Sequence, residues 1–274
     1  MNLSVRGETY YIHHHSLQED KPYLLMLHGF MGSSKVFDHL IPTLTEFCNP
    51  VTMDLLGHGL SSGGENPERY HLEEQLADLF EIANRLKPSK FYLYGYSMGG
   101  RLALRFALEH PEYLSGLILE STTYGIEGTD KVYERIQQDE QRAERIEQDF
   151  VSFLHDWASL PIFVTGSQVP DDLQDKYFRI QAGQNSRQMA RSLRGFGSAR
   201  MESVRTRLHE LDIPVLILSG EYDEKYKKLS EEMEHCISQG KAVVIPRAGH
   251  RVHLDHPLAL SETLRSHITG QKCS

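Results

Sequence analysis

The chain has 274 residues, 39% of them hydrophobic and 24% charged, and a formal charge of −9 at neutral pH. This length predicts one large globular domain, alone or with a sizeable insertion, and the negative charge disfavours nucleic acids and anionic membranes as partners. The three cysteines are widely spaced, no stretch is long and apolar enough to span a bilayer, and no secretory signal is visible, so we expect a cytoplasmic protein without a disulfide framework or a metal site.

The first 121 residues alternate apolar runs with helical patterns. Residues 9–12 are β-branched and aromatic and predict an N-terminal hairpin, with a polar connection at residues 18–22. Continuous apolar runs, typical of strands buried on both faces of a parallel sheet, occupy residues 23–27, 50–54, 91–94 and 117–120. Helical spacing is found at residues 36–47, 71–86 and 101–108. The alternation predicts an α/β fold with a right-handed, mainly parallel sheet flanked by helices.

This rhythm stops after residue 121 and resumes after residue 206. Residues 130–155 form one long, highly charged helical pattern, and shorter helical pieces continue to about residue 207. Strands are again predicted at residues 213–219 and 242–245, and helices near residues 225–238 and 257–268. We therefore expect an α/β core made of residues 1–121 and 207–274, with residues 122–206 forming a helical cap over the carboxyl edge of the sheet.

A glycine-flanked serine lies between a predicted strand and a predicted helix. Gly95, Ser97 and Gly99 form a G-x-S-x-G pattern after the apolar run 91–94. This context is typical of a nucleophile elbow, a strained corner that presents the serine hydroxyl, and small neighbours let strand and helix approach closely. The alternative is a glycine-rich turn that happens to contain a serine, and the flanking elements favour the elbow.

A serine hydroxyl needs a histidine to accept its proton, and that histidine needs a carboxylate to fix its tautomer. In α/β folds with a nucleophile elbow, the order of the three residues along the chain is serine, acid, histidine, and each lies in a loop after a strand. Asp223 follows the strand at 213–219, and His250 follows the strand at 242–245. We predict that Ser97, Asp223 and His250 form a catalytic triad.

Neighbouring acids and histidines are alternatives for these roles. Glu221 and Glu224 flank Asp223, but Asp223 has the best spacing from the glycine that ends the strand. His253 and His256 come after the expected tip of the loop, where a surface or helix-start role is favoured.

Other polar residues precede the serine in the chain. We interpret His28 and His58, both beside glycines, as structuring their loops, while a contact of either with substrate remains an alternative. Asp54 is expected to hold the loop at 55–64, and the histidines at 13–15 are interpreted as an exposed turn rather than a metal site, because neighbouring side chains of an extended segment point to opposite faces.

Backbone amides are the expected oxyanion donors. The first is that of Met98, directly after the nucleophile, and the second is that of Phe30, in the loop after the first buried strand. Together with His28-Gly29, the segment from Asp54 to Gly59 and Gly249-His250, the elbow resembles the α/β-hydrolase superfamily, a likeness that extends over the whole chain. The resemblance implies that fold and a triad, and says little about the substrate.

The distribution of arginine indicates an anionic substrate. Arg101 comes four residues after Ser97, one helical turn away on the same face. Residues 179–207 contain seven arginines and one acid, Glu202, a local charge of +6 that favours bidentate recognition of carboxylate or phosphate. The alternative, that these arginines pair with the acid-rich stretch 127–149, explains several of them. A charged cap also argues against a lipase, whose lid is apolar.

A set of finer motifs resembles the menaquinone-pathway 2-succinyl-6-hydroxy-2,4-cyclohexadiene-1-carboxylate synthases. These motifs are Ser97 through Leu104, Arg135-Ile136 with Asp139, Phe153 and Trp157 before 160–163, Ser192 through Gly195, and Gly220 through Asp223. The resemblance implies a lyase that eliminates pyruvate from an enolpyruvyl cyclohexene tricarboxylate, without a metal or organic cofactor. It also implies that Ser97 is the base, relayed through His250.

By motif position the resemblance implies substrate contacts for Arg101, Arg135 and Trp157, with Tyr96 as a further candidate. Three positions depart from the family pattern. Gln181 stands where a cap arginine is common, for which Arg179 or Arg187 could substitute, Phe37 stands where a tryptophan is common, and Leu56 replaces a proline.

Two other functions remain open at this point. One is a serine carboxylesterase or carbon-carbon hydrolase that acts on a small anionic substrate through an acyl-enzyme on Ser97. The other is a ligand-sensing or scaffold protein, which the complete set of triad and oxyanion candidates disfavours. A monomer and a homo-oligomer are both compatible with the sequence.

Overall fold

The computed structural model describes residues 1–86, 90–163 and 169–270. Within these ranges an eight-stranded sheet has the order β1-β2-β4-β3-β5-β6-β7-β8. The strands are β1 (Asn2–Val5), β2 (Glu8–His14), β3 (Tyr23–Leu27), β4 (Asn49–Met53), β5 (Phe91–Tyr96), β6 (Leu114–Glu120), β7 (Val215–Gly220) and β8 (Gly240–Ile245). Strands β3 to β8 are parallel, whereas β1 pairs antiparallel with β2, and β2 pairs antiparallel with β4. The predicted α/β sheet is confirmed.

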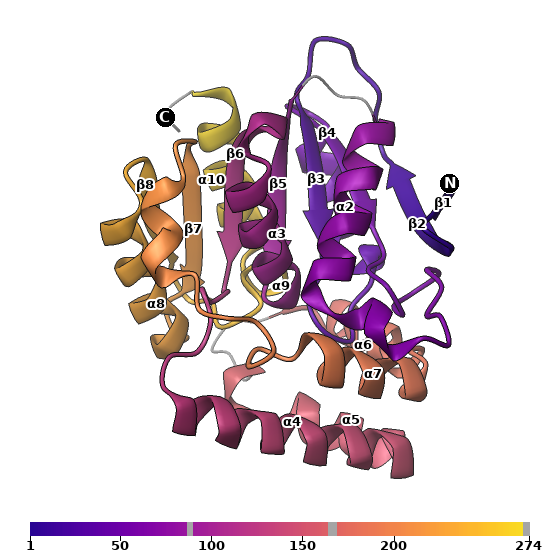
Figure 1. Cartoon of the computed structure of the whole chain (residues 1–274). Helices are drawn as coiled ribbons and strands as arrows, with labels where there is room; N and C mark the ends of the chain where they lie inside the picture. Colours follow the sequence, from indigo (N-terminus) through magenta and orange to yellow (C-terminus); the bar gives the residue numbers. More distant parts are fainter. Residues whose placement is uncertain (87–89, 164–168, 271–274) are drawn as a thin grey trace.

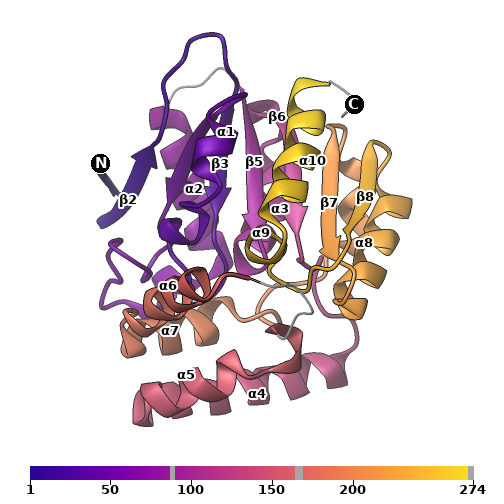
Figure 2. The same cartoon turned by 180° about the vertical axis from the view of Figure 1, so that it is seen from behind.

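Helices cover both faces of the sheet. One face carries α2 (Leu72–Leu86), α3 (Met98–Glu109) and α8 (Glu224–Cys236), seen in front in Figure 1. The other carries α1 (Ile41–Leu44), α9 (Val252–Asp255) and α10 (Pro257–Thr269), seen in front in Figure 2. Successive side chains of a strand point to opposite faces, so Leu25 and Leu27 of β3 join one apolar cluster, while Leu24 and Met26 join the other. This explains the continuous apolar runs in the sequence.

Four helices between β6 and β7 lie beyond the edge where the parallel strands end (Figure 1). They are α4 (Thr129–Gln148), α5 (Phe150–Ala158), α6 (Asp171–Ala182) and α7 (Ser186–Phe196). The expectation of one helix over residues 130–155 is wrong. Asp149 leaves the helical conformation, with φ −151°, and its carboxylate accepts a hydrogen bond from the Ser152 amide at 3.0 Å. Asp149 thereby caps a new helix, α5, and the chain changes direction between α4 and α5.

The N-terminal hairpin is present as predicted: it turns at Arg6 and Gly7, both with positive φ, and residues 18–22 belong to the connection between β2 and β3. The expected helix at 36–47 is divided into a 3-10 turn and α1, which has a proline in its first turn. The 3-10 turns are η1 (Ser34–Phe37), η2 (Pro67–Tyr70), η3 (Pro111–Tyr113), η4 (Pro161–Phe163) and η5 (Arg205–Glu210). Among the described residues, no helix has the length and apolar character needed to cross a membrane.

Candidate active site

The Gly-x-Ser-x-Gly segment forms a sharp corner between β5 and α3. Ser97 has φ 51° and ψ −104°, a conformation that non-glycine residues rarely adopt. A Cβ atom on Gly95 would lie 2.5 Å from the Gly99 carbonyl oxygen, and one on Gly99 would lie 2.6 Å from the His28 carbonyl oxygen. Both glycines are therefore needed for the close approach that presents the Ser97 hydroxyl, as the motif predicted.

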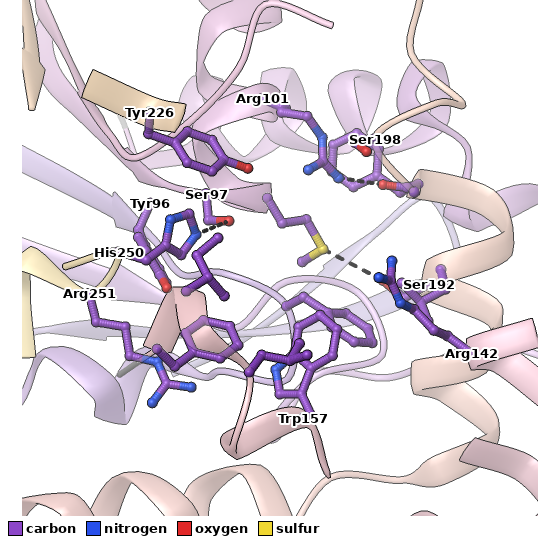
Figure 3. A pocket seen from close by; sticks show the side chains of 18 of the residues that line it. Tyr96, Ser97, Arg101, Arg142, Trp157, Ser192, Ser198, Tyr226, His250 and Arg251 are labelled. Carbon is purple, nitrogen blue, oxygen red and sulfur yellow. Dashed lines mark hydrogen bonds between the residues drawn. The ribbon is translucent and has the colours of Figure 1, made fainter. Parts of the chain in front are cut away.

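The three predicted triad residues meet at the carboxyl ends of their strands. His250, after β8, donates from Nδ1 to Asp223 Oδ2 at 2.7 Å, and its Nε2 lies 3.2 Å from Ser97 Oγ (Figure 3). Asp223, after β7, also caps α8 by accepting a weak bond from the Tyr226 amide at 3.4 Å. Only 6% of Asp223 and 3% of His250 are exposed, so this chain of polar groups is largely shielded from water.

The neighbouring acids and histidines have other partners. Glu221 accepts from the Arg247 amide at 2.7 Å, and Glu224 pairs with a lysine of its own helix. His253 is fully buried and donates from Nδ1 to Glu120 Oε1 at 2.8 Å, while His256 caps α10. These contacts favour Asp223 and His250 for the two roles.

The polar residues that precede the serine hold loops, as interpreted from the sequence. Asp54 accepts from the amides of Ser34 at 2.6 Å and Leu60 at 2.7 Å. His28 bonds to the Gly29 carbonyl oxygen at 2.8 Å, and its Nε2 accepts from the Leu55 amide at 3.0 Å. Burial lowers the pKa of the His28 imidazole to about 4. Its neutral ring therefore ties the loop after β3 to the loop after β4.

A cavity of about 240 Å³ opens beside Ser97, between the sheet and the cap helices. Figure 3 shows Ser97 and His250 on one wall and Trp157 on another. Phe30 and Met98, whose amides are the predicted oxyanion donors, both line the cavity. The Phe30 ring packs edge-on against Trp157, with centroids 5.6 Å apart. Tyr96 also lines it, and burial raises the pKa of the Tyr96 phenol, so this group stays neutral.

Arg101 lies under the elbow, as its spacing from Ser97 predicted. Its guanidinium donates to the Phe196 carbonyl oxygen at 2.6 Å and stacks over the Phe196 ring at 5.0 Å. Burial lowers the pKa of Arg101 to about 10, which still leaves it charged at neutral pH. Its Nε atom is buried and has no hydrogen-bond partner among the described residues, so part of its bonding capacity is available to a ligand.

The cap side of the cavity carries two more arginines. Arg135 donates from Nε to both oxygens of Asp139 at 2.9 Å, and Arg142 donates to the same carboxylate at 2.9 Å. Asp139 thereby fixes two guanidinium groups at the cavity wall. Arg142 lies 5.8 Å from the centroid of Trp157, whose buried Nε1 has no hydrogen-bond partner in the described part of the chain.

Sequence reasoning missed several cavity residues, among them Arg142, Lys225, Tyr226 and Arg251. A signal existed for each of these four. Arg142 comes seven residues after Arg135, two turns along the same helix face. Arg251 directly follows His250, and Lys225 and Tyr226 come two and three residues after Asp223. Burial and the charge of Arg135 lower the pKa of Lys225.

The arginine-rich stretch 179–207 does not supply the cavity cations. Of its seven arginines, all among the described residues, none lines the cavity. Arg187 is 66% exposed and lies 3.4 Å from Glu65, so its expected place at the substrate is wrong. Arg194 pairs with Glu140 and Glu147 of α4, in line with the alternative drawn from the sequence. The reason for Arg187 and Arg194 is that α7 turns its apolar residues inward, which directs these two arginines outward.

The three departures from the family pattern occupy different places. Gln181 is 2% exposed and lines the cavity. Phe37 is buried in the core, edge-on to Tyr94, and Leu56 is buried in the loop after β4. Among the described residues, no group of three or more histidine, cysteine or acidic side chains is arranged to hold a metal ion.

Comparison with known proteins agrees with this geometry. The family model for the alpha/beta hydrolase fold matches residues 22–257. The chain belongs to this family. A Bacillus subtilis (strain 168) protein proposed to be a 2-succinyl-6-hydroxy-2,4-cyclohexadiene-1-carboxylate synthase is 35% identical, over 90% of both chains. The synthase of that name from Enterobacter sp. (strain 638) is 29% identical, over 89% of this chain and 90% of that one.

A solved structure, that of MenH from S. aureus, has a TM-score of 0.89 and 30% identity, and covers 95% of this chain and 98% of its own. The resemblance to these synthases that the motifs indicated is therefore confirmed.

Proposed function

We propose that the protein is a carbon-oxygen lyase of menaquinone biosynthesis. It eliminates pyruvate from 2-succinyl-5-enolpyruvyl-6-hydroxy-3-cyclohexene-1-carboxylate and gives 2-succinyl-6-hydroxy-2,4-cyclohexadiene-1-carboxylate. Relatives of that name over nearly the whole chain support this function. The observation that carries it is the cavity itself, where arginines face a Ser-His-Asp chain, because this substrate bears three carboxylates.

The reaction begins with removal of the ring proton next to the succinyl carbonyl. The Ser97 oxygen takes this proton while its own proton passes to His250 Nε2, 3.2 Å away. The electron pair left on the ring shifts through the ring double bond and expels the enolpyruvyl oxygen. His250 returns the proton to the leaving enol, which becomes pyruvate, and Asp223 stabilises the transient imidazolium.

Negative charge develops on the succinyl carbonyl oxygen when the ring proton leaves. Phe30 and Met98 line the cavity that contains Ser97, and their backbone amides are our candidates for binding that oxygen. Donors fixed by the backbone stabilise such a charge without reorganising during the reaction.

The substrate carboxylates are assigned to the cations of the cavity. Arg101 and Arg135 are the proposed partners, with Arg142 beside Arg135 on the same helix. Trp157 provides an apolar wall and an indole N–H that has no partner among the described residues, and Tyr96 provides a neutral phenol. Arginine suits this role because its planar fork binds a carboxylate through two bonds.

Residues 122–206 are proposed to act as a cap on the core formed by 1–121 and 207–274. Helices α4 and α5 contribute cavity residues, so the cap is part of the substrate site. The cytoplasmic location and the choice between monomer and homo-oligomer stay predictions from the sequence.

Continuous measurement of pyruvate from the enolpyruvyl substrate tests the function. The wild-type protein is expected to release pyruvate together with one equivalent of the diene. No release above that of a Ser97→Ala control would contradict the lyase. A burst with activated short-chain esters, and no pyruvate, would instead favour a serine hydrolase.

A further inference from the structure

Arg251 is a cation of the cavity that has no role in the function described so far. Arg251 directly follows His250 and lines the same cavity as Ser97. Figure 3 shows it on the side of His250, across the cavity from Arg101 and Arg142. Its position therefore differs from that of the arginines already assigned to substrate carboxylates.

The Arg251 guanidinium is held by two aromatic rings. Its central carbon lies 4.0 Å from the centroid of Phe163 and 4.5 Å from that of Tyr177. Contact with ring faces orients a guanidinium but leaves its N–H donors unbonded, because they point outward in its own plane. The rings thus fix the direction of the donors without using them.

Two of these donors are unsatisfied. Nε and Nη2 of Arg251 are buried and have no hydrogen-bond partner in the part of the chain that the structure describes. The other three arginines of the cavity all have partners, namely the Phe196 carbonyl for Arg101 and the Asp139 carboxylate for Arg135 and Arg142. Buried donors of a charged group cost free energy unless a ligand bonds to them. An anionic group with two acceptor oxygens matches a fork with two open donors.

We propose that Arg251 binds one carboxylate of the substrate, on the opposite side of the cavity from Arg101 and Arg142. Ser97 and His250 then lie between two cationic ends, and the site selects molecules that carry carboxylates on both sides of the reacting carbon. Gln181, which lines the same cavity and is buried, is neutral and supplies no charge there. Arg251 belongs to the core and provides the positive charge that Gln181, on the cap, does not.

The identity of the substrate in this inference rests on the proposed function, but the anion site can be tested without it. Ser97 is modified with a neutral fluorophosphonate, and protection by succinate, glutarate and adipate is compared with protection by butyrate. In the wild-type protein we expect the best dicarboxylate to protect at a concentration at least about tenfold below that of butyrate. Arg251→Gln should abolish this advantage, and Arg251→Lys should retain part of it, because lysine keeps the charge but not the fork.

Arg187→Gln is the matched control, since it removes an arginine that pairs with Glu65 away from the cavity. It should keep the full advantage of the dicarboxylates. The thermal midpoint of each variant shows whether it is folded. If Arg251→Gln does not fold, the comparison of Arg251→Lys with the wild type tests the proposal instead. Equal protection of wild type and the Arg251 variants, or no preference for dicarboxylates in the wild type, would overturn the proposal.

Pyruvate release provides the second readout. If the wild-type protein is active, Arg251→Gln should raise KM about tenfold or more and change kcat less. If it releases no pyruvate, the proposed function fails, while the protection experiment still decides whether Arg251 binds a carboxylate.

Discussion

The two sides of the cavity are built on different principles. On the core side, Ser97, Asp223 and His250 each follow a parallel strand, and the backbone fixes where their side chains meet. On the cap side, Arg135 and Arg142 reach the cavity only because α4 is rotated to present that face and Asp139 holds them there. In the proposed function the core thus supplies the reacting groups at positions set by topology, together with Arg101 and Arg251, and the cap adds Arg135 and Arg142 through helix packing.

The largest effect is expected on the core side. Ser97→Ala removes the proposed base and should lower kcat by about 10³-fold or more, as loss of a triad member does in other enzymes. Pyruvate release under saturating substrate measures it. A loss below tenfold would show that the chemistry does not depend on the elbow.

A smaller effect, mostly on binding, is expected on the cap side. Arg135→Gln removes one of two guanidinium groups on Asp139 and should lower kcat/KM by roughly 10- to 100-fold, the usual range for a charged hydrogen bond. The measurement is kcat and KM for pyruvate release. A fall in kcat alone, with KM unchanged, would contradict the assignment of Arg135 to substrate binding.

The core loops also determine how the protein responds to acid. Burial lowers the pKa of His28 to about 4 and that of His58 to about 3, from 6.5 in the unfolded chain. Below about pH 6.5 these two histidines therefore bind protons in the unfolded chain but not in the folded chain, so the stability of the fold decreases as the pH falls. Each histidine should contribute on the order of 1 kcal/mol per pH unit until its folded pKa is reached.

Denaturant unfolding at pH 7, 5.5 and 4.5 measures this slope. His58→Asn, whose amide can replace the bond to the Leu56 carbonyl, should make the slope shallower. His235→Asn, a change at an exposed histidine, should leave it unchanged. An unchanged slope in His58→Asn would refute the assignment.

The smallest effect is expected outside the cavity. Arg187→Gln should change kcat/KM less than about twofold, because the side chain is exposed and its pair with Glu65 is a surface contact. Steady-state pyruvate release is the assay. A tenfold loss of kcat/KM would indicate that Arg187 contacts the substrate, and would contradict its position outside the cavity.

The sequence was sufficient to predict the parallel sheet and the meeting of Ser97, Asp223 and His250. Runs such as 23–27 show burial on both faces, and Ser97, Asp223 and His250 stand at strand ends in a fixed order, so local pattern and topology agree. Arg101 could be placed because one helical turn joins it rigidly to Ser97.

The cap could not be predicted in the same detail. Residues 130–155 have a continuous helical pattern, and the break at Asp149 depends on one capping hydrogen bond. The stretch 179–207 is rich in arginine, but the direction of Arg187 is set by the apolar face of α7, which only the packed structure shows. Composition therefore indicated an anionic ligand, although the cations of the cavity come from other segments.

The most direct test of the central claim is the mass of the ring product formed from substrate deuterated at the ring carbon that bears the succinyl group. The claim is that Ser97 and His250 remove this proton in an elimination. The account predicts a diene that has lost the deuterium and gained no water, with one pyruvate per turnover. A ring product that keeps the deuterium and is one water heavier than the diene would contradict it and assign the triad to hydrolysis.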